Sequence, residues 1–196
     1  MSKLQTPFRY DFVGSFLRPQ ALKDAKTDFQ SGKLSKEKYD EIVNDEIAKV
    51  VAKQKELGFH VITDGEFRRT FWHLDFMWGL DGVEHVSTGG GVQFNAELAV
   101  LDDTYLVGKV KAKPHPFVEY FKFLKQFEDE NTVAKYTIPA PAQTFQQMIV
   151  PANYETTRKF YETDEELIQD IGLAYQDVIR QFYDAGCRNL QLDDCT

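Results

Sequence analysis

Hydrophobic residues recur at helical spacing in two long stretches of the chain. In the first stretch, Ser35 is a candidate N-cap and Gly58 is a candidate stop, so the pattern predicts a helix between them. In the second stretch, the corresponding residues are Thr163 and Gly186. A shorter helix is predicted to begin near Pro19. The residues expected on the buried side of the second long helix are Leu167, Ile168, Ile171, Ala174, Tyr175, Val178, Ile179, Phe182 and Tyr183.

Short β-prone runs lie between the helical stretches. They cover residues 8–12, 61–63, 92–94, 98–101, 105–112, 133–138 and 189–194. Alternating strands and helices are typical of a parallel β/α sheet, and the runs within 92–101 predict a β-hairpin excursion before a third barrel-type strand at 105–112. A further helix is expected to open at Pro114-His115-Pro116. We therefore expect an α/β fold of the (β/α)8 TIM-barrel type.

The length of the chain limits how much of such a barrel it can form. A closed barrel usually needs about 250 residues and eight strands. The chain has 196 residues, and its pattern gives about five barrel strands. We expect residues 1–196 to form a single partial TIM-barrel domain, the N-terminal part of a complete barrel.

Composition excludes several classes of protein. The formal net charge of -8 argues against a protein that binds the phosphate backbone of nucleic acids. No apolar stretch is long enough to span a bilayer, and residues 1–7 lack the apolar core of a signal peptide. Cys187 and Cys195 do not form the pattern of a disulfide framework. We expect a soluble, cytoplasmic protein with no nucleic-acid or membrane partner.

Polar residues follow three of the predicted strands. These are Gly14-Ser15, Asp64-Gly65-Glu66 and Asp193-Asp194. In a barrel, the carboxyl ends of the strands meet on one face, where functional side chains gather. Ser15 and neighbouring backbone N–H groups could bind a carboxylate, while Glu66 and Asp193 could bind an ammonium group. Turn chemistry explains each segment alone, but the three together suggest a site for an amino acid.

Nearby basic and histidine residues have two interpretations each. Arg68 and Arg69 could bind an anionic substrate tail, or they could form structural ion pairs with neighbouring acids. His115 stands between two prolines, where a capping or turn role competes with acid catalysis. His73 lies in an aromatic run that could be a packed helix start.

Several motifs occur in the order found in one known family. They are Val13-Gly14-Ser15-Phe16, Thr63-Asp64-Gly65-Glu66, Gly108-Lys109-Val110 with Pro114-His115-Pro116, Ile138-Pro139-Ala140-Pro141-Ala142, and Leu190-Gln191-Leu192-Asp193. On these motifs the whole chain resembles the catalytic barrel of cobalamin-independent methionine synthase, especially its shorter single-barrel relatives. The resemblance implies a 5-methyltetrahydropteroyltriglutamate–homocysteine S-methyltransferase. In that family a zinc-bound homocysteine thiolate attacks the methyl group of a reduced folate, which gives methionine.

The resemblance also implies roles for individual residues. Val13, Gly14 and Ser15 correspond to the segment that binds the homocysteine carboxylate. Glu66 and Asp193 correspond to the acidic residues that hold the amino group. Phe145 stands where the full-length enzymes carry a tryptophan beside the pterin. No catalytic residue is assigned.

Two departures from the family pattern concern the metal and the methyl donor. The family's zinc ligands are a His-x-Cys pair, a glutamate and a second cysteine, all beyond the fifth strand, so the resemblance implies that this chain ends before them and holds no metal. Around Ala99-Val100 the chain lacks the Arg-Cys pair that the longer enzymes use near the folate. The expected methyl donor is therefore a reduced folate or a corrinoid-linked carrier.

Two alternatives to the methionine-synthase activity stay open at this point. The first is a related barrel enzyme that acts on another thiol or small-group donor, as in coenzyme M-type transferases. The second is a non-catalytic fragment that binds a ligand. An open sheet edge after Asp193 would favour self-association, so a homodimer is a possible assembly.

Overall fold

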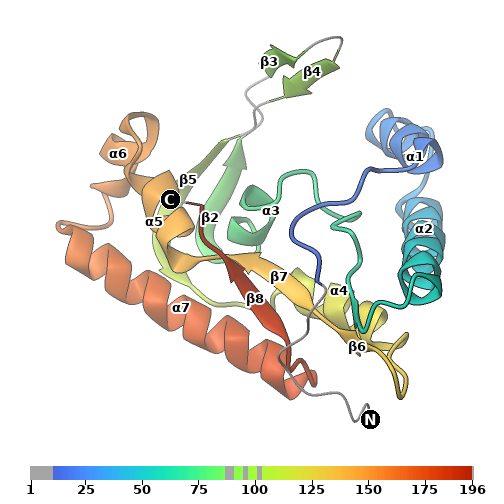
Figure 1. Cartoon of the computed structure of the whole chain (residues 1–196). Helices are drawn as coiled ribbons and strands as arrows, with labels where there is room; N and C mark the ends of the chain where they lie inside the picture. Colours follow the sequence, from blue (N-terminus) through green and yellow to red (C-terminus); the bar gives the residue numbers. More distant parts are fainter. Residues whose placement is uncertain (1–10, 87–90, 95–96, 101–102, 196) are drawn as a thin grey trace. The chain divides into compact units, whose positions relative to one another are not determined.

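The computed structural model describes residues 11–86, 91–94, 97–100 and 103–195 (Figure 1). The chain divides into two compact units. The first comprises the residues up to Trp72, Tyr120–Thr137 and Cys187–Gln191. The second comprises His73–Glu119, Ile138–Gly186 and the residues from Leu192 onward. The boundary of a single domain, 1–196, stays a prediction.

The predicted starts of two helices in the first unit are confirmed. Helix α1 (Gln20–Gln30) follows Pro19, and helix α2 (Lys36–Glu56) follows Ser35, whose side chain accepts a hydrogen bond from the Lys38 N–H. Satisfying an N–H group that has no partner within the helix stabilises the first turn of α2. Gly58 adopts a positive φ of 81° just after α2, a conformation that glycine tolerates best.

The strands of the first unit are short and parallel where their register is defined. Strand β1 (Val61–Ile62) pairs in parallel with β6 (Val133–Ala134). Strands β7 (Tyr136–Pro139) and β8 (Leu190–Asp193) pair with each other and begin in this unit, where the Tyr136 N–H donates to the Asn189 carbonyl. The run predicted as one strand at 133–138 is therefore two strands, which separate at Lys135 and bind different partners.

The second unit contains two antiparallel pairs. Strand β2 (Asp81–Val86) pairs with β5 (Asp103–Lys111), and β3 (Gly91–Phe94) pairs with β4 (Glu97–Val100). The β3–β4 pair agrees with the expected hairpin. The expectation that residues 105–112 form a third parallel barrel strand was wrong, because β5 runs antiparallel to β2. The hydrophobic pattern did not predict β2, whose register with β5 is interrupted between Asp81 and Val83.

In the part of the chain that the structure describes, four helices of the second unit contact β5. Helix α3 spans Leu74–Met77, α5 spans Pro141–Ile149, α6 spans Pro151–Thr157 and α7 spans Asp164–Asp184. Helix α4 (Pro116–Lys125) begins in this unit and ends in the first. Thr163 caps α7 through the Glu166 N–H, as predicted. Among the described residues, no helix is both long enough and apolar enough to cross a membrane.

The buried side of α7 is narrower than predicted. Leu167, Ile171, Ala174, Tyr175, Val178 and Phe182 are buried, while Ile168, Ile179 and Tyr183 are exposed. The buried residues follow the i, i+4, i+7 and i+8 spacing of one helix face. The three exposed residues follow buried ones directly in sequence, so the helical turn carries them off that face.

The partial barrel is confirmed only as a mixed α/β fold. In the described ranges the strands pair two by two and form no closed barrel, so the five-strand barrel segment is not confirmed. The predicted strand at 8–12 lies mostly outside the described residues, and Asp11 and Phe12 are not in a strand.

Candidate functional site

The chain makes a tight turn directly after β1. The side-chain amide of Gln54 donates to the Thr63 carbonyl and accepts from the Thr63 N–H, at 2.8 and 2.9 Å. Gly65 and Glu66 then adopt positive φ angles of 65° and 58°. The left-handed conformation is uncommon for glutamate, and it is supported here by Asp64, whose Oδ1 accepts from the Glu66 N–H at 2.9 Å.

The segment that contains Val13, Gly14 and Ser15 is attached to this turn. The Phe16 N–H donates to the Gly65 carbonyl at 3.1 Å. Arg18 donates to the carbonyls of Glu66 and Arg69 at 3.1 and 2.8 Å. A Cβ on Gly65 would lie 2.9 Å from Cδ2 of Phe16, so the close approach of the segment requires glycine.

The other end of the segment is held by Lys135. Its buried ammonium lies 2.5 Å from Asp11 Oδ1 and also donates to the Phe12 carbonyl and, at 2.9 Å, to Gln191 Oε1. Lys135 is the residue at which β6 and β7 separate. The segment is thus fixed on both sides of residues 13–15, which are exposed.

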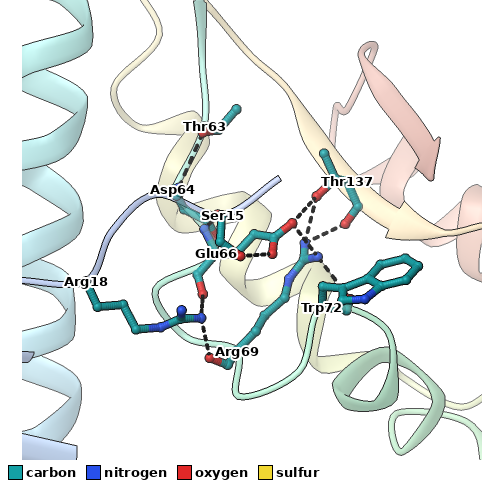
Figure 2. Close-up of polar contacts among 9 residues, drawn as sticks. Ser15, Arg18, Thr63, Asp64, Glu66, Arg69, Trp72 and Thr137 are labelled. Atoms are coloured by element: carbon teal, nitrogen blue, oxygen red, sulfur yellow. Dashed lines mark hydrogen bonds and ion pairs between the residues drawn. The ribbon is translucent and has the colours of Figure 1, made fainter. Parts of the chain in front are cut away.

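The Glu66 carboxylate is surrounded by hydrogen-bond donors (Figure 2). The Ser15 hydroxyl donates to Oε2 at 2.5 Å. On the other oxygen, Oε1, the Arg69 Nη1 and the Thr137 hydroxyl both donate at 3.2 Å. All four residues lie in the first unit, and the side chains of Glu66 and Arg69 are nearly fully buried.

Burial controls the electrostatics of this cluster. Burial raises the pKa of the Asp64 carboxyl, and nearby Arg69 opposes this shift only in part. Asp64 Oδ2 is buried and has no hydrogen-bond partner among the described residues. Burial alone would lower the pKa of Arg69, but Tyr136, Asp64 and Glu66 outweigh it, so the pKa of Arg69 is raised. The cluster therefore favours a charged Arg69 beside the Glu66 carboxylate.

The structure brings together two of the predicted site residues, Ser15 and Glu66. Val13 and Gly14 lie beside them on the exposed segment, with Val13 81% exposed. Phe145 is half-buried on α5, and Asp193 is half-buried at the end of β8, where its carbonyl accepts from the Ala140 N–H at 2.8 Å. Phe145 and Asp193 belong to the second unit. Their participation in a site with Glu66 stays a prediction.

The structure distinguishes the two arginines. Arg69 forms the structural ion pair that was one of its two interpretations. The Arg68 guanidinium lies about 5 Å from the ring centres of Tyr120 and Phe123 and donates to Asn44. Sequence reasoning missed the contribution of Thr137, which lies 68 residues from Arg69 and carries no local signal beyond its place in a buried strand.

The histidine and cysteine residues do not form a metal site within the described ranges. No group of three or more His, Cys, Asp or Glu side chains there could hold a metal ion. His115 accepts from the Phe117 N–H at the start of α4, which fits the capping role. Burial raises the pKa of the Cys187 thiol to about 11, which disfavours the thiolate that binds zinc. The described residues therefore do not fit the zinc of the family.

A surface hollow of about 220 Å³ lies elsewhere in the first unit. It is found near the residues that precede β1 and β6, whereas the Glu66 turn follows the end of β1. Its lining includes the ion pair between Lys55 and Asp129. In β/α folds ligands bind at the carboxyl ends of strands, so the Glu66 turn is the better candidate.

Comparison with known proteins identifies the family to which the chain belongs. The model of the family described as "Cobalamin-independent synthase, Catalytic domain" matches residues 10–196. The protein YxjH of Bacillus subtilis (strain 168), whose name gives no function, is 40% identical over 97% of this chain. A 5-methyltetrahydropteroyltriglutamate–homocysteine methyltransferase of Bradyrhizobium diazoefficiens is 26% identical over 93% of this chain and 22% of its own length.

A solved structure supports the same relationship. The putative vitamin-B12 independent methionine synthase of Listeria monocytogenes matches 98% of this chain with a TM-score of 0.77 and 40% sequence identity. The chain covers 53% of that structure and 48% of YxjH. It therefore spans about half the length of these relatives.

Proposed function

Because the chain belongs to the family of the cobalamin-independent synthase catalytic domain, we propose that it binds L-homocysteine as part of an S-methyltransferase. The Bradyrhizobium relative is named for transfer of a methyl group from 5-methyltetrahydropteroyltriglutamate to homocysteine, which supports this substrate. The observation that carries the proposal is the 2.5 Å contact between Ser15 Oγ and Glu66 Oε2.

That contact places two complementary groups side by side. A carboxylate such as Glu66 accepts hydrogen bonds from an ammonium group, and a hydroxyl such as Ser15 donates to a carboxylate. The α-ammonium and α-carboxylate of an amino acid are attached to the same carbon. The Ser15 hydroxyl has one proton, which it donates to Glu66 when no ligand is bound. In the proposed complex this hydroxyl turns to the α-carboxylate of the ligand, together with the backbone of Val13 and Gly14, and the α-ammonium takes its place at Glu66.

The remaining predicted residues complete the proposal. Asp193 is assigned as a second partner of the ammonium group, and Phe145 as an aromatic neighbour of the methyl donor. In this proposal residues 1–196 are one part of a (β/α)8 barrel, and the methyl donor is a reduced folate. A corrinoid-linked carrier, homodimer formation and a cytoplasmic location stay predictions from the sequence.

The role left to this chain is to bind and orient the substrate. In the family, zinc supplies the homocysteine thiolate, which is a far better nucleophile than the thiol. The described residues do not fit that metal, so no step of the proposal uses it. Glu66, fixed by Arg69 and Thr137, would instead determine where the amino-acid end of the substrate is held.

Calorimetric titration of the full chain with L-homocysteine tests the proposal. We expect the wild-type chain to bind without added zinc, and Glu66→Gln to weaken binding by about tenfold or more because the charge that attracts the ammonium group is lost. Glu84→Gln is the matched control, since Glu84 is exposed on β2. Its affinity should stay within about twofold of the wild type, as is usual for surface substitutions.

Other ligands and conditions give the outcomes that would contradict the proposal. Coenzyme M has a sulfonate and no ammonium group, so it should not bind; binding in preference to homocysteine would favour a coenzyme M-type transferase. Binding that requires zinc would mean that this chain contains a metal site. Absence of homocysteine binding by a folded wild-type sample in both conditions would overturn the proposal.

A further inference from the structure

Arg69 is held in place by several groups of the first unit. Its Nη2 donates to the hydroxyl of Thr137 at 3.1 Å and to the carbonyl of the same residue. Its guanidinium carbon lies 5.2 Å from the ring centre of Tyr136. The side chain is 1% exposed. Because a planar guanidinium that is bonded on several sides has little freedom to rotate, Arg69 is a rigid support for Glu66.

The two oxygens of Glu66 have different surroundings (Figure 2). Oε1 accepts from Arg69 and from Thr137, both buried. Oε2 accepts from Ser15, which is exposed. In the proposed complex the Ser15 hydroxyl turns to the ligand carboxylate, and a carboxylate oxygen can accept more than one hydrogen bond, so Oε2 can accept from a ligand donor on the side of Ser15.

We propose that Arg69 is a positioning residue that, with Thr137, occupies Oε1 of Glu66 and thereby directs Oε2 at the ammonium group of the ligand. This inference rests on the proposed function. It assigns the selection of ligands with an amino group to a side chain that does not itself touch the ligand. The geometry of the pair, with Arg69 and Thr137 both on Oε1, fixes the orientation of the carboxylate toward Ser15.

The inference predicts an effect that depends on the ligand. Replacement of Arg69 should lower the affinity for ligands that contact Glu66 Oε2. The affinity for ligands that lack an amino group should stay the same. L-homocysteine and its deamino analogue, 4-mercaptobutanoate, differ only in that group. If the role of Arg69 is purely structural, its replacement should lower the affinity for both ligands to the same extent.

Calorimetric titration of both ligands into the full chain tests this. For Arg69→Met we expect homocysteine affinity to fall about tenfold or more, because Glu66 loses the charge-assisted hydrogen bond that orients it, while 4-mercaptobutanoate affinity changes less than about twofold. Arg69→Lys should recover part of the loss, because it restores the charge without the forked geometry. Arg180→Met is the matched control, since that arginine is exposed.

Thr137→Val provides a second test that keeps the charge of Arg69. It removes one donor to Oε1, and we expect a smaller loss of affinity that is again confined to homocysteine.

If Arg69→Met does not fold, Arg69→Lys and Thr137→Val decide the question. Equal losses for the two ligands in these variants, with a wild type that binds homocysteine, overturn the Arg69 inference alone. A folded wild type that binds neither ligand overturns the proposed function and this inference together.

Discussion

The ammonium of Lys135 lies 2.5 Å from Oδ1 of Asp11, a residue 124 positions earlier in the chain. Lys135 is buried, and it also donates to the Phe12 carbonyl. These bonds fix the chain immediately before Val13, Gly14 and Ser15. The exposed segment that faces Glu66 is therefore attached to the strands of the first unit by a side chain that is far from it in sequence.

Replacement of Lys135 by methionine should loosen this attachment. Loss of the hydrogen bonds of a buried charge predicts a decrease of about 1–3 kcal/mol in the free energy of unfolding, measured by urea denaturation. Homocysteine affinity should also fall, because the segment would lose its fixed position. Lys113→Met, at an exposed position, is the control. Unchanged stability and affinity in Lys135→Met would contradict the anchoring role.

Ser15→Ala separates binding from stability. Ser15 is exposed, so we expect the free energy of unfolding to change by no more than about 0.5 kcal/mol. The variant loses the hydroxyl that is proposed to bind the ligand carboxylate, so homocysteine affinity should fall about tenfold in calorimetric titration. Ser31→Ala, also exposed, should leave affinity unchanged. A Ser15→Ala chain that binds as tightly as the wild type would exclude this contact.

Gly65→Ala tests the close approach between the turn and the segment. The new Cβ would lie 2.9 Å from the Phe16 ring, at a backbone position with a φ of 65°. Both effects predict destabilisation of about 1–3 kcal/mol in urea denaturation. Gly172→Ala is the matched control: it lies within α7, its Cβ meets nothing within 4 Å, and it should stabilise by about 0.5–1 kcal/mol. A Gly65→Ala chain as stable as the wild type would refute the steric argument.

Local signals in the sequence were sufficient for the helices with polar caps. Ser35 and Thr163 mark the starts of α2 and α7, and each accepts the backbone hydrogen bond that the pattern implied. Helices α5 and α6 were missed: neither is capped by a side chain, and the proline that opens each of them was not interpreted as a helix start, although Pro19 before α1 was. Periodicity alone also could not decide which neighbours of a buried residue stay exposed, as Ile168 on α7 shows.

Strand pairing depended on information that local patterns lack. Residues 133–138 are continuously β-prone, yet they belong to two strands. The residues before Lys135 pair with β1, and the residues after it pair with β8. The direction of β5 depends on β2, which the pattern did not predict. Pairing partners are set by tertiary packing, so a strand can be located from sequence while its neighbour remains unknown.

The sequence was enough to predict which residues belong to the candidate site, but not how they are arranged in space. Glu66 was identified from its place after a strand, and the structure adds its contact with Ser15. The roles of Arg69 and Thr137 required the fold, because Thr137 reaches Glu66 from a position 71 residues away. The contribution of Asp193 and Phe145 is a prediction from the family resemblance.

The last prediction concerns the pH dependence of stability and uses Asp64→Asn. Burial raises the pKa of Asp64 in the folded chain above its ordinary value of 3.8. The folded state therefore binds a proton more tightly than the unfolded state does at this residue. As pH rises from the ordinary value through the folded-state pKa, Asp64 must lose its proton, and its contribution to the free energy of unfolding declines.

Asparagine does not titrate, and its amide oxygen can still accept from the Glu66 N–H. The free energy of unfolding of Asp64→Asn minus that of the wild type should therefore increase as pH rises from about 4 toward neutrality, and then level off above the folded-state pKa. Urea denaturation of both proteins in parallel at each pH measures this difference, and Asp177→Asn, at an exposed position, is the control. A difference that stays constant or declines with rising pH would show that Asp64 is not protonated preferentially in the folded chain.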